Sequence, residues 1–254
     1  MEIEAFSNKM AQMWDKIYGP KSDAEVSFYL CQVTKEGGLK GKTLDIGCGT
    51  GRFLLPMLEK GYAIEGVEPS VPMVAVLNQK AESYRLDPVI HVVPFSDFQA
   101  KYLYAGVTSF NFFPYIVDDK MTYDFLENVF KILEKNGVFV FNYYNVYEYW
   151  DNKGWSDIFL NINERGFSRI ESFISPIDFI YGIVKEELYC FVVYDGISHV
   201  DCYARKIRFR TKSEVSFLLE KIGFDKIVIS SGINNFYNMD KRNKIEMLYV
   251  VAKK

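Results

Sequence analysis

Short apolar runs alternate with amphipathic segments between residues 41 and 142. The runs have the length of strands and lie at 42–46, 62–67, 89–93, 104–110 and 137–142. The segments between them place apolar residues at helical spacing, at about 51–60, 71–83 and 120–134. Strands separated by helices predict an α/β fold with a parallel, doubly wound sheet. In such a sheet, ligands bind at the carboxyl ends of the strands.

The pattern changes after residue 142. Three longer segments of alternating residues follow, at 167–175, 180–194 and 197–210. Asp195-Gly196 joins the last two, and Asp-Gly between alternating runs predicts a hairpin. We therefore expect 143–210 to form a small antiparallel sheet, inserted on the substrate side of the fold.

The two ends of the chain complete this plan. Residues 1–40 are predicted to form a helical cap, with helices at about 11–18 and 22–33. After the insert, Thr211 is a plausible helix N-cap with Glu214 as its capping-box partner, and Gly223 ends that helix. Strands at 225–230 and 246–252 follow. We expect a single domain that spans 1–254.

A glycine-rich turn follows the first predicted strand. Residues 43–53 read T-L-D-I-G-C-G-T-G-R-F, and Glu68 follows Gly47 by twenty-one positions, after a second apolar run. Glycines let a ligand approach the backbone closely, and an acid at this spacing can accept hydrogen bonds from ribose hydroxyls. A dinucleotide fingerprint needs a third glycine where Arg52 or Leu54 stands, so neither register fits.

The pattern D-x-G-x-G-x-G, formed by Asp45, Gly47, Gly49 and Gly51, resembles that of the class I S-adenosylmethionine (SAM)-dependent methyltransferases. The segment 211–224 and the closing strand are also similar to that family. The resemblance implies a Rossmann-like sheet of seven strands in the order 3-2-1-4-5-7-6, with the last strand antiparallel. It also implies SAM as cofactor, S-adenosylhomocysteine (SAH) as product and no metal.

The resemblance further implies roles for individual residues. Asp45 would orient the turn and bind the methionyl ammonium, Glu68 would hold the ribose, and Asp97 would take the adenine amino group. Cys48 would contribute its backbone. The full set of implied cofactor-binding residues is Tyr18, Asp45, Gly47, Cys48, Gly49, Glu68, Pro69, Met73, Asp97, Phe98 and Phe110.

Several of these positions have a second interpretation. Tyr18 is equally consistent with an amphipathic helix that caps the sheet. Met73 either lies against the adenine or fills the core, and Phe98 is either adenine wall or core. Asp97 could also be a loop or N-cap aspartate. Phe110 and Asn111 follow the fourth strand and are the expected contacts at the methyl-transfer centre.

Candidates for a catalytic base are few. The chain has two histidines; His91 falls on the third predicted strand, which we expect to be buried, and His199 falls in the inserted hairpin. His199 and Tyr143 are the weak candidates for a base, which a hydroxyl or ammonium acceptor would need. An aromatic cluster could cage a cationic substrate or form a hydrophobic seam beside the insert; its members are Tyr143, Tyr144, Tyr149 and Trp150.

Charge and composition narrow the class of substrate. The net charge is −3 and no run of Lys or Arg occurs, which argues against a nucleic-acid partner. Residues 112–115, F-F-P-Y, fail the motif with which amino methyltransferases of nucleic acids hold their target, because Asn111 stands one position too early.

Cysteines and hydropathy bear on the compartment. The four cysteines are scattered and suggest neither a zinc site nor a disulfide framework. The acidic N-terminus has no signal-type core, and no apolar run is long enough to span a membrane. We expect a cytoplasmic protein.

Together these features predict SAM-dependent methyl transfer to a nitrogen or oxygen of a small molecule. The alternatives are a methyltransferase of RNA or protein, or a non-catalytic scaffold. In layout, the insert is similar to that of methyltransferases acting on amino sugars. A homodimer through the inserted sheet is a further expectation.

Overall fold

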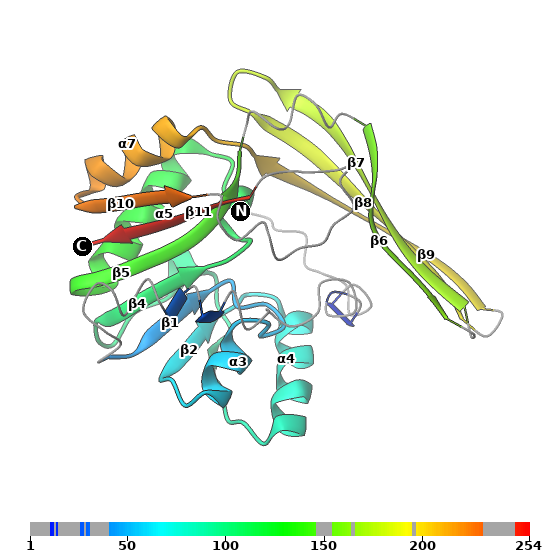
Figure 1. The fold of residues 1–254 in the computed structure, drawn as a ribbon, viewed down its shortest axis with the longest axis horizontal. Helices are drawn as coiled ribbons and strands as arrows, with labels where there is room; N and C mark the ends of the chain where they lie inside the picture. Colours follow the sequence, from blue (N-terminus) through cyan, green and yellow to red (C-terminus); the bar gives the residue numbers. More distant parts are fainter. Residues whose placement is uncertain are drawn as a thin grey trace.

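The structure is a computed structural model. It describes residues 41–145, 154–163, 166–194, 197–230 and 247–254, and seven residues nearer the N-terminus, which are 11, 12, 14, 26, 27, 29 and 30. These residues form a helix-covered sheet and a second sheet that projects from it (Figure 1).

The main sheet has seven strands in the order β10-β11-β5-β4-β1-β2-β3. Its strands are β1 (Thr43–Ile46), β2 (Ile64–Val67), β3 (Val89–His91), β4 (Tyr104–Ser109), β5 (Leu133–Tyr144), β10 (Lys226–Ser230) and β11 (Met247–Lys253). Strand β11 runs antiparallel to both of its neighbours, while the other pairs are parallel. Numbered within this sheet alone, the order is 3-2-1-4-5-7-6, which confirms the expected topology.

Helices connect the strands and cover both faces of the sheet. They are α3 (Leu54–Glu59), α4 (Val71–Tyr84), α5 (Asp119–Ile132) and α7 (Lys212–Ile222), with 3-10 turns η1 (Phe95–Asp97) and η2 (Phe113–Tyr115). The predicted cap of α7 is confirmed, because Thr211 accepts from the Glu214 N–H at 3.1 Å and Gly223 ends the helix with a φ of 116°.

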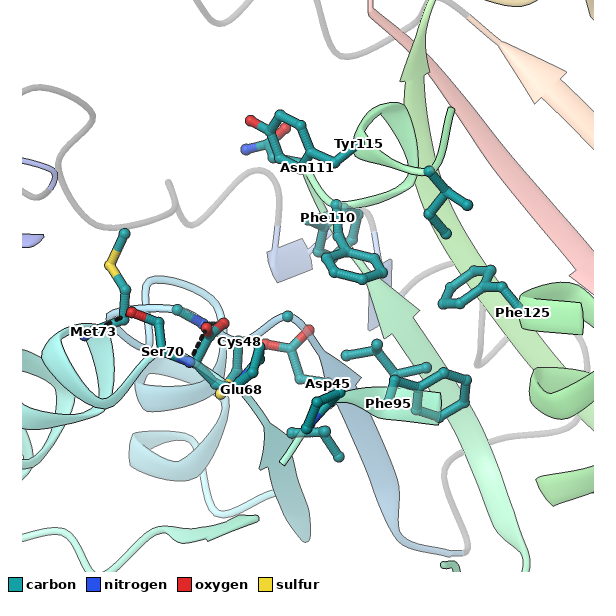
Figure 2. Close-up of a pocket in the computed structure, with 18 of the residues that line it drawn as sticks. Asp45, Cys48, Glu68, Ser70, Met73, Phe95, Phe110, Asn111, Tyr115 and Phe125 are labelled. Carbon is teal, nitrogen blue, oxygen red and sulfur yellow. Dashed lines mark hydrogen bonds between the residues drawn. The ribbon is translucent and has the colours of Figure 1, made fainter. Parts of the chain in front are cut away.

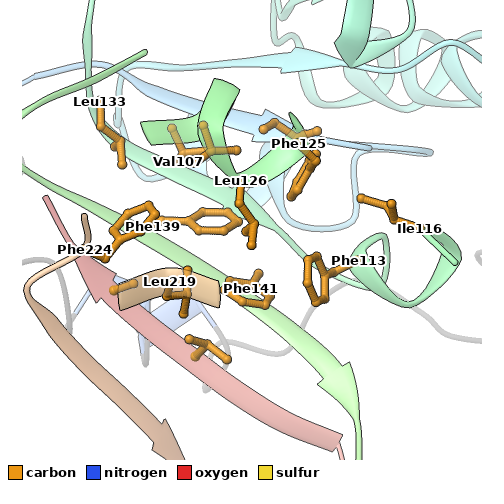
Figure 3. Close-up of a cluster of buried hydrophobic side chains, with 14 of the residues drawn as sticks. Val107, Phe113, Ile116, Phe125, Leu126, Leu133, Phe139, Phe141, Leu219 and Phe224 are labelled. Atoms are coloured by element: carbon orange, nitrogen blue, oxygen red, sulfur yellow. The ribbon is translucent and has the colours of Figure 1, made fainter. Parts of the chain in front are cut away.

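The core lies in two layers, one on each face of the sheet, and β5 contributes to both. Phe139 and Phe141 are fully buried against α5 and α7 (Figure 3), whereas Val138 and Val140 pack on the α3 and α4 side. This division follows from the two-residue period of a strand. Burying each phenylalanine side chain stabilises the fold by about 1.5–3 kcal/mol.

The second sheet contains four antiparallel strands in the order β6-β7-β8-β9. They are β6 (Gly154–Asn163), β7 (Gly166–Asp178), β8 (Ile183–Tyr194) and β9 (Ile197–Arg208). The predicted β8–β9 hairpin is confirmed by the pairing of Tyr194 with Ile197. The prediction missed β6 because its apolar residues do not alternate: Ile158, Phe159 and Leu160 are consecutive, and the pairing with β7 shifts register between Asp157 and Phe159.

The junction between the sheets differs slightly from the prediction. Tyr143 and Tyr144 belong to β5, so the main sheet extends beyond the expected boundary at 143. The outgoing and returning segments meet where Asn145 bridges to Arg210.

The described residues of the N-terminal segment are helical, as predicted, and the Tyr29 hydroxyl lies 3.1 Å from Thr43 Oγ1. None of the helices within the described residues is long and apolar enough to cross a membrane.

Candidate functional site

The turn between β1 and α3 requires its glycines for different reasons. Gly47, Gly49 and Gly51 have φ values of 71°, 54° and 77°, a conformation that glycine adopts without strain. A Cβ at Gly47 would come within 2.9 Å of the Phe112 ring, and one at Gly51 within 2.9 Å of Leu55. At Gly49 a Cβ would meet only the Gly47 carbonyl, at 4.0 Å, so this residue faces open space.

Glu68 follows β2 and ties the glycine turn to the start of α4. One carboxylate oxygen accepts from the Gly49 N–H at 3.0 Å and the other from the Ser70 N–H at 2.9 Å (Figure 2). The residue is buried, 8% exposed. Burial raises the pKa of Glu68, although the two backbone N–H groups oppose that rise. Further hydrogen-bond donors would therefore stabilise its ionised form.

Asp45 and Cys48 lie beside this carboxylate. Asp45 is buried on β1 and its Oδ1 accepts from Thr108 Oγ1 at 2.7 Å. Burial, with the charges of Asp45 and Glu68, raises the pKa of the Cys48 thiol well above its usual value. The thiol therefore stays neutral, and it packs where a Cβ on Gly66 would stand, 2.6 Å from that point. The Cys48 carbonyl accepts from the Gly51 N–H at 2.9 Å, so its backbone builds the turn.

A cavity of about 590 Å³ opens at the carboxyl ends of β1, β2 and β4. Glu68, Ser70 and Met73 stand at one end of it, and Asn111 and Tyr115 at the other (Figure 2). Most of the residues predicted from the sequence lie in its wall, namely Asp45, Gly47, Cys48, Gly49, Glu68, Pro69, Met73, Asp97 and Phe110. Its volume suits a cofactor-sized ligand together with a small second molecule.

Two predicted residues lie elsewhere. Phe98 is not in the wall; its ring packs on His91, with centroids 4.9 Å apart, and on Phe95, and the ring that reaches the cavity here is Phe95. Tyr143 is fully buried in the core and does not line the cavity, so its placement does not support a role as catalytic base. Packing against neighbouring aromatic rings decides both positions.

Some predictions fall outside the described residues. These are Tyr18 and, from the aromatic cluster, Tyr149 and Trp150. His199 belongs to β9 and its backbone pairs with Val192 of β8, while its side chain is outside the described part of the structure.

The wall also holds residues that the sequence did not single out. Arg52 was expected in the first turn of a helix, but α3 begins at Leu54, and Arg52 lines the cavity at 7% exposure. Trp14 and Tyr115 also line the cavity, and Tyr115 stands at the end distant from Glu68. The sequence did carry a signal for two of them, because Arg52 is a polar residue directly after the glycine turn and Tyr115 is an aromatic residue soon after β4.

The second sheet contacts the cavity wall through Arg205 of β9. Its guanidinium donates to the Tyr115 hydroxyl, lies 4.7 Å from the centre of that ring, and lies 5.8 Å from the centre of the Trp14 ring. Glu186 of β8 pairs with Arg205 and also accepts from Ser172 Oγ at 3.2 Å. Three strands of the second sheet thus support an aromatic wall of the cavity.

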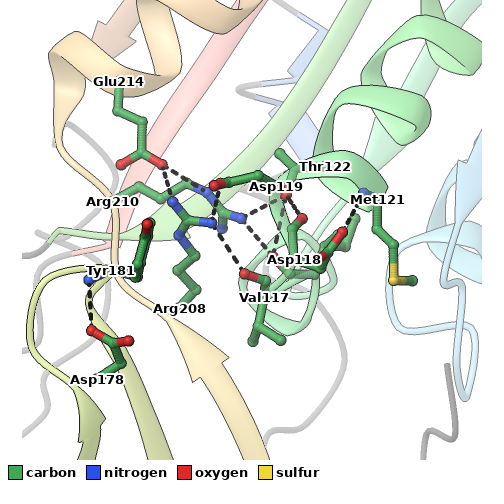
Figure 4. Close-up of polar contacts among 11 residues, drawn as sticks. Val117, Asp118, Asp119, Met121, Thr122, Asp178, Tyr181, Arg208, Arg210 and Glu214 are labelled. Carbon is green, nitrogen blue, oxygen red and sulfur yellow. Dashed lines mark hydrogen bonds and ion pairs between the residues drawn. The ribbon is translucent and has the colours of Figure 1, made fainter.

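Two further arginines hold the segment between η2 and α5 (Figure 4). Arg210 is fully buried and donates to the Ile116 carbonyl and to Thr122 Oγ1, the latter at 2.9 Å. Arg208 donates to the Val117 carbonyl at 3.1 Å. Because Ile116 lines the cavity, the chain leaving the second sheet fixes part of the wall.

Comparison with known proteins agrees with this geometry. A family model described as a methyltransferase domain matches residues 24–227. A protein of Geobacillus sp. strain WCH70, named as a methyltransferase, is 22% identical over 151 residues, which are 58% of this chain and 60% of that relative's length. This chain thus spans less than two thirds of that curated relative.

Solved structures share the fold. A SAM-dependent methyltransferase from Clostridium acetobutylicum ATCC 824 superposes with a TM-score of 0.77 at 18% identity, covering 97% of this chain and 98% of the other. CalS10 from Micromonospora echinaspora, described as an amino pentose methyltransferase with bound SAM, gives a TM-score of 0.76 at 14% identity, covering 96% of each chain. Since the family model spans most of the sequence and the sheet order agrees, the chain belongs to the methyltransferase domain family, of the class I SAM-dependent type that the glycine turn indicates.

Proposed function

We propose that this protein transfers a methyl group from SAM to a nitrogen or oxygen atom of a small molecule. The observation that carries the proposal is the Glu68 carboxylate, which bridges Gly49 and Ser70 in the wall of the cavity. It stands where a ribose would meet both the glycine turn and the start of α4.

The residues present fit a nucleoside with a charged tail. Each oxygen of Glu68 accepts one backbone N–H, and an ionised carboxylate oxygen has a second lone pair for a ribose hydroxyl. Gly49 faces open space, so the nucleoside can approach the turn. Met73 and Asp97 would contact the adenine, and the buried carboxylate of Asp45 would receive the methionyl ammonium.

Methyl transfer from SAM requires mainly that the acceptor atom be aligned with the methyl group. SAM supplies a methyl group on a positively charged sulfur, and the sulfur leaves as a neutral thioether. The chain must hold the acceptor in line with that methyl group, and such positioning can account for about 7–11 kcal/mol of the barrier. A neutral amine then needs little further help, whereas a hydroxyl or an ammonium needs a base.

The acceptor end of the cavity favours a small molecule. Phe110, Asn111 and Tyr115 line it together with Trp14, and Arg205 of the second sheet closes against Tyr115 and Trp14. The total volume of about 590 Å³ leaves limited room beside a cofactor. A relative of the same fold, CalS10, is described as acting on an amino pentose, which supports an amine acceptor of that size.

Transfer of labelled methyl from SAM to a panel of amines, amino sugars, phenols and RNA tests the proposal. We expect label in an amine or a hydroxyl compound and none in RNA. Glu68→Ala should lower the signal strongly at limiting SAM, and the exposed α4 variant Glu82→Ala should leave it unchanged. Label in RNA or protein alone would overturn the choice of a small-molecule acceptor.

A further inference from the structure

A pair of asparagine amides joins the segment after β4 to the end of β5, next to the cavity. Asn142 of β5 is fully buried. Its Oδ1 accepts from the backbone N–H of Asn111 at 2.6 Å, and its Nδ2 donates to Asn111 Oδ1 at 2.9 Å. The same Nδ2 also contacts the Met247 sulfur on β11. Asn142 is thus held by the segment after β4 on one side and by β11 on the other.

Asn111 has an unusual backbone conformation. Its φ is 58°, in the left-handed region that residues other than glycine rarely occupy. Asparagine tolerates this region better than most residues, and here the paired amide of Asn142 stabilises it. Asn111 lines the cavity, whereas Asn142 stands behind it.

The left-handed residue sends its two neighbours in different directions. In an extended chain, residues 110 and 112 would point to the same side. Here Phe110 packs with the core layer of α3 and α4, and Phe112 packs with the opposite layer, that of α5 and α7. The change of direction occurs at Asn111.

Both phenylalanines contact the glycine turn. The Phe110 ring lies 4.9 Å from the Phe53 ring, measured between centroids, at the end of that turn. The Phe112 ring occupies the space that a Cβ on Gly47 would need. The turn that carries Gly49 is therefore held from both faces of the sheet.

We propose that Asn142 is a positioning residue for cofactor binding, because its amide pair with Asn111 fixes the backbone that lets Phe110 and Phe112 hold the glycine turn. The inference rests on the proposed function, in which this turn binds SAM. It concerns a residue that does not itself reach the cofactor. Neither its chemistry nor its position in β5 marks it as a site residue in the sequence.

Calorimetric titration with SAH tests the inference, with unfolding of each variant followed in parallel. Asn142→Leu should weaken SAH binding by about tenfold, since it leaves the Asn111 N–H and Oδ1 without partners. The matched control is Tyr104→Phe. Tyr104 begins β4, at the end distant from Asn111, and the variant removes a buried hydroxyl that donates to Glu65 of β2. It should lower stability while SAH affinity stays within about twofold of the wild type.

Substitutions at Asn111 separate backbone conformation from side-chain chemistry. Asn111→Gly keeps the left-handed region accessible and should lose less SAH affinity than Asn111→Val. Asn111→Val cannot adopt that region without strain and should bind as weakly as Asn142→Leu. In the Asn111→Gly background, Asn142→Leu should reduce SAH affinity by less than it does alone. The hydrogen bond from Asn142 Nδ2 to the residue 111 side chain is already absent there.

The outcomes separate this inference from the proposed function. Wild-type affinity in Asn142→Leu, or equal losses in Asn111→Gly and Asn111→Val, would contradict the positioning role. Failure of the wild type to bind SAH would instead contradict the proposed function. In that case, crystal structures of the unliganded wild type and of Asn142→Leu still test the inference. In Asn142→Leu we expect Asn111 to leave the left-handed region and Phe112 to move away from Gly47. An unchanged backbone would overturn the inference.

Discussion

Two buried glutamates near the ends of β2 show how local partners decide the chemistry of a residue. Burial raises the pKa of Glu65. Three donors lower that pKa by more than burial raises it, so the net shift is downward; they are the Tyr102 hydroxyl at 2.6 Å, the Tyr104 hydroxyl, and Lys42 at 3.3 Å. Glu68 has only two backbone donors, and its pKa is raised. Glu65 is therefore satisfied by the protein, whereas Glu68 has capacity left for a ligand.

The Glu65 cluster should make part of the stability depend on pH. A carboxyl whose pKa is lowered on folding stabilises the protein above its unfolded value of about 4.3, and this contribution is lost as the pH falls through the folded pKa. Glu65→Gln should lower the free energy of unfolding by about 1–3 kcal/mol near neutral pH. Urea unfolding of both proteins across the acid range checks this. A difference that stays constant into strong acid would contradict it.

Glu68 should make SAH affinity depend on pH. The pKa of Glu68 is raised in the folded, ligand-free protein, so its carboxyl takes up a proton more readily than in the unfolded chain. Protonation removes the buried charge, so the destabilisation that this charge causes is relieved as the pH falls. Ribose hydroxyls would donate to the ionised form. SAH affinity should therefore fall as the pH drops through this raised pKa, beginning above about pH 4.3.

Titration calorimetry with SAH over the acid range measures this dependence. Glu68→Gln should bind more weakly and show a flatter profile. Identical pH profiles of SAH affinity for the wild type and Glu68→Gln would show that Glu68 does not control SAH binding.

At the scale of elements, η2 and the segment after it connect the two sheets. Arg210 lies 4.6 Å from the centre of the Phe113 ring and holds the Ile116 carbonyl and Thr122 Oγ1. Burial, with the nearby charge of Arg208, lowers the pKa of Arg210 to about 9. The guanidinium is therefore charged at neutral pH, and its planar shape reaches both partners.

Loss of Arg210 should destabilise the whole chain. Arg210→Leu leaves the Ile116 carbonyl and the Thr122 hydroxyl short of a donor, and we expect a loss of about 1–3 kcal/mol and a melting temperature lower by several degrees. Arg210→Lys should recover little, since an ammonium does not reproduce the planar fork. Thermal unfolding checks this, with the exposed Lys212→Ala as control. Full stability in Arg210→Leu would show that the contact is unimportant.

The elements were predictable where the pattern was local. Alternation of strand and helix, the Thr211 cap and the Gly223 stop located the main sheet, because each depends on neighbouring residues. Strand β6 was missed since its apolar residues are consecutive rather than alternating, and its pairing with β7 contains a register shift. The sequence left Phe98 open between adenine wall and core, because an alternating pattern does not tell which of two nearby aromatic rings, Phe95 or Phe98, turns toward a cavity.

At the scale of the whole molecule, the cavity combines parts that lie far apart in the chain. The Asp45-to-Glu68 half lies within a short stretch and was recognisable in the sequence. The opposite wall depends on Arg205 reaching Tyr115 and Trp14 across the junction of the two sheets, and on Asn142 pairing with Asn111. Phe110 and Asn111 of this half were expected from the family resemblance, but the long-range contacts that hold the wall leave no local signal and required the structure.

Calorimetric titration of the full chain with SAH tests the central claim most directly. We expect one site per chain with a dissociation constant on the order of micromolar, and a loss of about 1–3 kcal/mol of binding free energy in Glu68→Ala. The absence of binding in the wild type, or an unchanged affinity in Glu68→Ala, would contradict the account.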